Sequence, residues 1–226
     1  MNIIRFLAFR LKTIRGMTVV HIGAHSGEEA ERYQRWCARR VVWFEAAPYI
    51  FEKLQAHIKE IRKQKRSLFA WLTGAPRTEH ILVQALVGEA DGKTAAFHLF
   101  DNDGASNSIF RMARDEDDRF PGVRETGEVL ALPVQTLDRE LENAGVSPES
   151  VDVLVLDVQG AELLCLKGAP RVLKTARYIE TEVSREPVYE GGVLLSELES
   201  WLSKRNYVRK TSVRRSHMNT IFVRSD

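Results

Sequence analysis

Val19-Val20-His21-Ile22-Gly23-Ala24-His25-Ser26-Gly27 is the stretch of sequence that decides the fold. Apolar β-forming residues lead into a Gly-x-x-x-Gly turn, and a helical pattern opens at Glu28. Glycines in such a turn let a ligand lie against bare backbone, and the free amides at the start of the helix point toward that ligand. The stretch predicts the first strand-turn-helix unit of a nucleotide-type α/β fold. The alternative is an ordinary strand-to-helix turn of any α/β protein.

The composition is ordinary for a soluble globular protein. Of the 226 residues, 44% are hydrophobic and 28% are charged, and the formal net charge is +2. This length favours one substantial domain, and so small a net charge gives no argument for a nucleic-acid partner. Cys37 and Cys165 lie far apart in regions expected to be helical, so neither a disulfide framework nor a metal-binding knuckle is indicated. We expect a reducing, cytoplasmic location.

The first residues form a basic amphipathic segment. We expect this segment to span residues 1–16 and to precede a domain over residues 17–226. Its apolar runs are too short, and too often interrupted by cations, for a signal-peptide core or a membrane-spanning helix. A helix in residues 1–15 could rest on an anionic membrane surface, or it could pack on its own domain.

Strand and helix patterns alternate along the rest of the chain. We expect strands at 41–44, 81–87, 94–100, 129–134, 151–156, 178–183, 207–211 and 220–223, and helices at 28–40, 48–66, 136–144, 161–174 (interrupted at 168–170) and 194–204. The nearly all-apolar run Val151–Leu156 is typical of a central parallel strand that is buried on both faces. Residues 101–128 form a long polar insertion, which is either a functional lid or a mobile surface loop.

Two acidic residues stand at the ends of predicted strands. Glu45 lies about twenty residues after the glycine turn, where a carboxylate can accept hydrogen bonds from ribose hydroxyls. Its alternative role is to favour the N-terminus of the next helix. Asp157 follows the apolar strand and therefore stands in the crevice where open α/β sheets bind ligands.

With these elements in order, the chain resembles the FkbM-type methyltransferases, a family of class I enzymes that depend on S-adenosylmethionine and mostly methylate hydroxyl groups. The resemblance covers roughly residues 17–223, and the segments that carry it are 21–27, 44–46, 137–138, 157–162, 166–169 and 179–182. It implies a Rossmann-like class I methyltransferase fold, with a mostly parallel central sheet, an antiparallel C-terminal strand and helices on both faces. It also implies S-adenosylmethionine as cofactor and S-adenosylhomocysteine as product.

This chain departs from the family's motifs in several places. His21 stands where the family usually has Asp, His25 where it has Asn, Ala46 where it has Pro, and Val155 where it has Lys. A carboxylate at position 21 would help to hold the charged end of the methionine moiety, whereas a neutral imidazole brings no negative charge. We therefore expect a weaker cofactor affinity or an unusual pH dependence. The residues expected to bind the cofactor are His21, Gly23, Ala24, His25, Gly27, Glu45, Ala46 and Asp157.

Methyl transfer from a sulfonium to oxygen is an in-line displacement, and an alcohol must lose its proton as the new bond forms. Asp157 is the candidate base, although it could instead bind the cofactor or cap the helix that follows; Glu182 is the second candidate. A divalent ion could lie between these carboxylates, but nothing in the spacing requires one, and we predict no metal. For a hydroxylated small-molecule or glycan acceptor we expect contacts from the polar side chains of Ser106, Asn107, Ser108 and Tyr189.

We predict an O-methyltransferase that depends on S-adenosylmethionine and acts on a sugar, a glycan, or a glycosylated or natural-product metabolite. A nicotinamide-dependent oxidoreductase is one alternative, since it also uses a glycine turn and a ribose-binding acid, but the Gly-x-Gly-x-x-Gly pattern is absent. A non-catalytic binding module is another alternative, and the substitutions His21 and Val155 keep it open.

Overall fold

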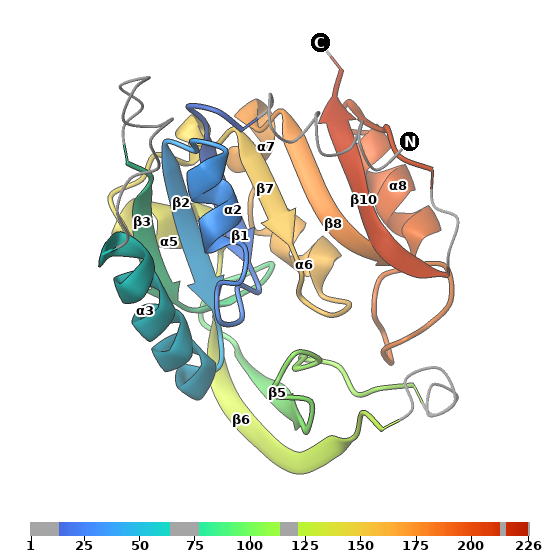
Figure 1. Cartoon of the computed structure of the whole chain (residues 1–226). Helices are drawn as coiled ribbons and strands as arrows, with labels where there is room; N and C mark the ends of the chain where they lie inside the picture. The colour runs from blue at the N-terminus through green and yellow to red at the C-terminus, as the bar shows by residue number, and fades with distance from the viewer. Residues whose placement is uncertain (1–13, 64–76, 114–121, 213–215, 226) are drawn as a thin grey trace.

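The computed structural model describes residues 14–63, 77–113, 122–212 and 216–225, and in these residues a seven-stranded sheet has the order β3-β2-β1-β7-β8-β10-β9 (Figure 1). The strands are β1 (Thr18–Ile22), β2 (Arg40–Glu45), β3 (Glu79–Gln84), β7 (Val153–Leu156), β8 (Tyr178–Ser184), β9 (Tyr207–Arg209) and β10 (His217–Arg224). Neighbours from β3 to β8 run parallel, whereas β10 runs antiparallel to β8 and β9. The predicted mostly parallel sheet with an antiparallel C-terminal strand is confirmed.

Helices cover both faces of this sheet, as predicted (Figure 1). The helices α2 (Ala30–Arg35) and α3 (Pro48–Lys63) lie on one face, and α5 (Leu137–Asn143), α6 (Glu162–Lys167), α7 (Val172–Thr175) and α8 (Leu195–Ser203) lie on the other. Successive side chains of a strand point to opposite faces. Val19 therefore packs in the core beneath α2 and α3, while Val20 packs in the core beneath α5 to α8. Burial on both faces explains why β1 reads as a continuous apolar run.

The strand expected over residues 81–87 is wrong, because two sheets divide this stretch. β3 ends at Gln84, and β4 (Leu86–Val87) belongs to a second sheet of order β4-β6-β5 in the described part of the chain. The other strands of this sheet are β5 (Thr94–Phe100) and β6 (Glu125–Gln135). β6 begins inside the expected polar insertion, because its first residues are mostly exposed and show no apolar alternation. The second sheet lies below the carboxyl ends of the parallel strands (Figure 1).

The helix expected over residues 28–40 is shorter in the structure, and Cys37 lies outside it. α2 ends at Arg35, and Cys37 has a φ of 57° in the turn that leads to β2. The turn is needed because the short chain between α2 and β2 must reverse its direction. Cys165 is helical and buried, as expected, and the break at residues 168–170 separates α6 from α7.

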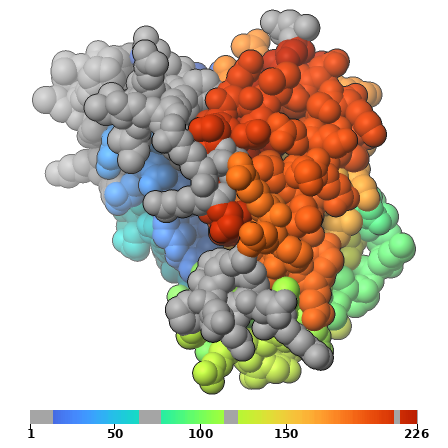
Figure 2. Space-filling view, turned by 90° about the vertical axis from the view of Figure 1, so that its right-hand side faces the viewer, coloured from blue at the N-terminus to red at the C-terminus, as the bar shows by residue number. Residues whose placement is uncertain are grey.

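Some expectations fall on residues outside the described ranges. These include the amphipathic segment up to residue 13, the basic end of the helix beyond Lys63, and the acidic run at 115–118. Ile14, the first described residue, is buried in the core beneath α2 and α3. None of the helices in the described ranges is long and apolar enough to cross a membrane. Viewed from the β10 side, the C-terminal segments (orange to red) form the upper right part of the surface (Figure 2).

Candidate functional site

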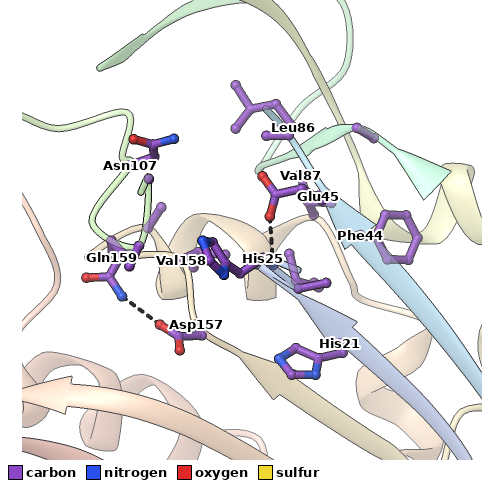
Figure 3. Close-up of a pocket in the computed structure, with 18 of the residues that line it drawn as sticks. His21, His25, Phe44, Glu45, Leu86, Val87, Asn107, Asp157, Val158 and Gln159 are labelled. Carbon is purple, nitrogen blue, oxygen red and sulfur yellow. Dashed lines mark hydrogen bonds between the residues drawn. The ribbon is translucent and has the colours of Figure 1, made fainter. Parts of the chain in front are cut away.

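A cavity of about 230 Å³ opens at the carboxyl ends of β1, β2 and β7 (Figure 3). The strand order reverses between β1 and β7, and open α/β sheets bind their ligands at such a reversal. The lining comes from the glycine turn after β1, the ends of β2 and β4, the turn at 157–161, and the loop that contains Gly104 and Asn107. The structure therefore brings together segments that the sequence analysis singled out separately.

The glycine turn is clamped between the ends of β2 and β7. The backbone amides of Gly23 and Ala24 both donate to the carbonyl of Phe44, at 3.0 Å. Gly23 has a φ of 76°, and a Cβ at this position would lie 1.7 Å from the backbone oxygen of Asp157. Gly27 is similarly confined, since its Cβ would lie 2.7 Å from Leu54 Cδ1. The turn thus requires glycine at position 23 for its close packing against the end of β7, whether or not a ligand also approaches there.

Glu45 stands at the end of β2 with its carboxylate fixed by backbone amides. Oε2 accepts from the amide of His25 and Oε1 from the amide of Ala47, both at 2.9 Å. Burial raises the pKa of Glu45 above its ordinary value, although these hydrogen bonds oppose the shift. Ala47 directly precedes α3, so the carboxylate acts at a helix start. Each oxygen keeps a further lone pair that could accept a hydrogen bond from a ribose hydroxyl. Ribose binding by Glu45 therefore stays a prediction.

His25 connects the glycine turn to the loop after β5. Its Nδ1 lies 2.8 Å from Glu28 Oε1, and its Nε2 lies 3.0 Å from the carbonyl oxygen of Asp103. Both partners can only accept, so both ring nitrogens carry hydrogen and the imidazole is positively charged. Burial lowers the pKa of His25, but the bonds to Asp103 and Glu28 outweigh it and raise the pKa. Lys53 also holds this loop, through a 2.6 Å ion pair with Asp103.

His21 lies at the cavity edge, but most of its surface packs against aromatic side chains. Its ring stacks on Trp43 with a centroid distance of 5.4 Å, and its Nδ1 lies 3.2 Å from the Tyr33 hydroxyl. Trp43 comes from the neighbouring strand and Tyr33 from α2. His21 is only 5% exposed, so it lines the cavity while also belonging to the core.

Asp157 and Glu182, the two candidate bases, are joined by a residue that the sequence analysis did not assign. Gln159 donates from Nε2 to Asp157 Oδ1 at 2.6 Å and to Glu182 Oε2 at 3.1 Å. Its Oε1 accepts from the Tyr189 hydroxyl at 2.7 Å. Gln159 has a φ of 53°, an unfavourable backbone conformation for a residue with a side chain. The turn after β7 therefore directs one amide group at both carboxylates.

Asp157 lines the cavity, and its side chain is exposed there (Figure 3). Partial loss of solvation beside the cavity wall and the nearby negative charge of Glu182 raise its pKa well above that of an ordinary carboxyl group. Glu162 lies buried in the first turn of α6, where burial raises its pKa to about 7. The site thus concentrates acidic groups, and of Asp157, Glu162 and Glu182 it is Asp157 that lines the main cavity.

A second unassigned residue, His217, contacts this group from β10. Its Nε2 lies 2.7 Å from Glu182 Oε1. Gln159 could have been noticed because it falls within the motif at residues 157–162. No local pattern marked His217, because only the pairing of β10 with β8 places it beside Glu182.

The residues expected to bind the acceptor are divided by the structure. Asn107 lines the main cavity, but its side chain binds the Phe100 amide and the Tyr49 hydroxyl. The Ser108 hydroxyl donates to the carbonyl of Gln159, and the Ser106 hydroxyl accepts from Asn102. Tyr189 lies close to the candidate bases instead. The first three thus shape the loop above the cavity, and their role in acceptor binding stays a prediction.

Comparison with known proteins gives three findings. The model of the methyltransferase FkbM domain family matches residues 21–209. The 2-O-methyltransferase NoeI of Sinorhizobium fredii is 24% identical over 180 residues, a match that covers 76% of this chain but only 65% of NoeI. The crystal structure of magnesium protoporphyrin IX methyltransferase (ChlM) from Synechocystis PCC 6803 with bound SAM has a TM-score of 0.50 and 8% identity, with 99% of this chain and 76% of that chain covered. This structural likeness bears on the fold alone.

Proposed function

Because this chain belongs to the FkbM methyltransferase family, we propose that it transfers the methyl group of S-adenosylmethionine to a hydroxyl of a sugar, a glycan, or a glycosylated or natural-product metabolite. Dependence on S-adenosylmethionine follows from the family, and the nicotinamide hypothesis is set aside. Oxygen as the acceptor atom is supported by the activity in the name of the distant relative NoeI. The observation that carries the proposal is the position of Asp157, a carboxylate with a raised pKa at the wall of the cavity.

The lining of the cavity suits the chemistry of S-adenosylmethionine. The apolar residues Phe44, Ala46, Leu86, Val87, Phe97 and Ile109 could cover the adenine ring. Glu29 lines the same cavity and could hold the ammonium group, while Glu45 could bind the ribose hydroxyls. When bound, S-adenosylmethionine supplies a methyl carbon on a positively charged sulfur.

The chain's own part in the reaction is to orient the acceptor hydroxyl and to take its proton. Asp157 would take the proton of the acceptor hydroxyl as the methyl group passes to the acceptor oxygen and S-adenosylhomocysteine is left. We place this role on Asp157 because it lines the main cavity whereas Glu182 does not, and because Gln159 and His217 each already contact one oxygen of Glu182. A carboxylate with a raised pKa is also a stronger proton acceptor than an ordinary one.

Calorimetric titration of the purified protein with S-adenosylhomocysteine tests the cofactor site, and titration with NAD is the control. We expect saturable binding of S-adenosylhomocysteine alone.

Labelled S-adenosylmethionine is then offered with neutral sugars and glycosylated metabolites, and we expect label to appear in an ether that resists mild base. Binding without transfer to any hydroxyl compound would favour a non-catalytic module. Transfer to nitrogen or carbon instead would contradict the proposed acceptor atom.

Replacing His25 by Ala is expected to weaken the binding of S-adenosylhomocysteine by about threefold to tenfold, since partly exposed charged hydrogen bonds hold the loop over the cavity. These bonds need the imidazolium form. Affinity in the wild-type protein should therefore decline as the pH rises through the raised pKa of His25.

The matched control is Lys53→Ala, which removes an exposed contact to the same loop without touching the glycine turn. We expect it to change affinity by less than about twofold. Equal losses in the two variants would mean that His25 has no special part in cofactor binding.

A further inference from the structure

We propose that His217 is a positioning residue for the paired carboxylates: it holds the Glu182 side chain in place beside Asp157, and thereby leaves Asp157 as the group that accepts the proton. This inference rests on the proposed function and adds a residue to it. His217 lies 60 positions from Asp157 in the chain and outside the family-model match, which ends at residue 209.

The geometry of the sheet places His217 beside Glu182. β10 runs antiparallel to β8, with His217 opposite Ser184 and Asn219 opposite Glu182. Side chains two residues apart on a strand share one face, so His217 and Glu182 are diagonal neighbours on the same face. Their 2.7 Å contact is partly buried, since the side chains are 24% and 20% exposed. An ion pair in this setting is screened less by water and salt than one on the surface.

The direction of each hydrogen bond points to the same arrangement. His217 approaches Oε1 of Glu182, and the Gln159 amide donates to Oε2, so each carboxylate oxygen has its own donor. The same amide also donates to Asp157 Oδ1. Within the described ranges, these bonds occupy both oxygens of Glu182 but only one of Asp157. Because Asp157 also lines the main cavity and Glu182 does not, a hydroxyl that enters this cavity meets the second oxygen of Asp157.

The charges around His217 agree with this role. The carboxylates that face it are Glu182 on β8, Asp157 after β7 and Glu162 on α6; Tyr189 is a neutral neighbour, and Glu29 beside α2 acts on Asp157. The hydrogen bond to Glu182 raises the pKa of His217, against the effect of burial. In return, the positive charge of His217 lowers the pKa of Asp157, which burial and Glu182 raise. The positive charge of His217 therefore favours the ionised form of Asp157.

Proton NMR of the histidine side chains tests the pair directly, without cofactor or acceptor. The His217 signal is identified by its absence in His217→Gln, and its titration is followed in the wild-type protein and in Glu182→Gln. We expect the midpoint in Glu182→Gln to fall by about one pH unit or more, because the anionic partner is lost. An unchanged midpoint would overturn the proposal.

The effect on Asp157 is read from the binding of a cationic and a neutral ligand. Calorimetry measures the affinity for S-adenosylmethionine and for S-adenosylhomocysteine at pH values from about 5.5 to about 9, in steps of about one unit. Binding of the cation should strengthen as the carboxylates lose protons, and binding of the neutral thioether much less. In His217→Gln we expect the midpoint for S-adenosylmethionine to move upward by about half a unit to one unit, because Asp157 has lost a neighbouring cation.

The control is His98→Gln, which removes the same kind of side chain 4.0 Å from another carboxylate, Glu125, in the second sheet. It should leave the midpoint unchanged. A lower melting temperature of His217→Gln with the wild-type midpoint would indicate a merely structural residue and contradict the proposal. Failure of both ligands to bind at any pH would count against the proposed function, whereas the NMR titration would still decide whether Glu182 and His217 form the charged pair.

Discussion

Replacing Asp157 by Asn is expected to lower the rate constant for methyl transfer by about 100-fold to 10,000-fold, the range that a general base contributes. The amide keeps the shape of the carboxylate, and its oxygen can still accept the 2.6 Å hydrogen bond from Gln159. It cannot take a proton from the acceptor hydroxyl. Single-turnover kinetics at saturating S-adenosylmethionine would measure the loss apart from any change in cofactor affinity.

The pH dependence of the wild-type protein should show the same carboxylate. Burial and Glu182 raise the pKa of Asp157 to about 7, and only the ionised form can accept a proton. The rate should therefore fall as the pH drops through about 7, and this acid limb should vanish in Asp157→Asn. A raised pKa in the folded state also means that ionisation of Asp157 costs stability above its unfolded-state pKa. At about pH 8 the Asn variant does not have this cost, so its melting temperature should equal or exceed that of the wild-type protein.

Asp152→Asn is the matched control, because Asp152 lies just before the same strand at its opposite end. There its carboxylate accepts a 2.9 Å hydrogen bond from the Thr18 amide, and the side-chain oxygen of Asn could accept the same hydrogen bond. We expect nearly full activity. If Asp157→Asn loses activity only in proportion to a weaker affinity for S-adenosylhomocysteine, then Asp157 binds the cofactor and is not the base.

Replacing Gly23 by Ala is expected to abolish measurable cofactor binding and to destabilise the fold by about 3 kcal/mol, combining overpacking with an unfavourable backbone conformation. The new Cβ would lie 1.7 Å from the backbone oxygen of Asp157, so the glycine turn and the end of β7 would have to separate. That separation moves both the amides of the turn and the candidate base. Calorimetry with S-adenosylhomocysteine and thermal unfolding would measure the two effects, with a fall in Tm of about 6 to 12 °C.

Gly145→Ala separates backbone strain from steric clash. Gly145 has a φ of 72°, close to the 76° of Gly23, but no atom lies within 4 Å of its added Cβ. We expect a loss of about 1 kcal/mol and unchanged cofactor affinity, because only the left-handed conformation is penalised. Similar losses in the two variants would contradict the clash at Gly23.

The regular elements were largely predictable because their signals are local. The apolar runs of β1, β2 and β7 fit strands buried on both faces, and the first glycine turn marks the crossing from β1 toward α2. The pattern did not reveal the second sheet. β4 has two residues, and its pairing with the distant Val134 and Gln135 leaves no periodicity in the sequence. Likewise, nothing local distinguishes the end of α2 from the left-handed turn at Cys37.

The sequence by itself determined the α/β fold class and the glycine turn, and it placed Asp157 and Glu45 at strand ends as candidates for the site. It could do so because apolar periodicity and turn chemistry depend on residues that are close together in the chain. Only the tertiary structure decided how the site is connected. Gln159 meets Glu182 across 23 residues and Tyr189 across 30, and His217 joins them through strand pairing. Such contacts depend on sheet order and register, which bring distant side chains together without leaving a pattern in the sequence around any of them.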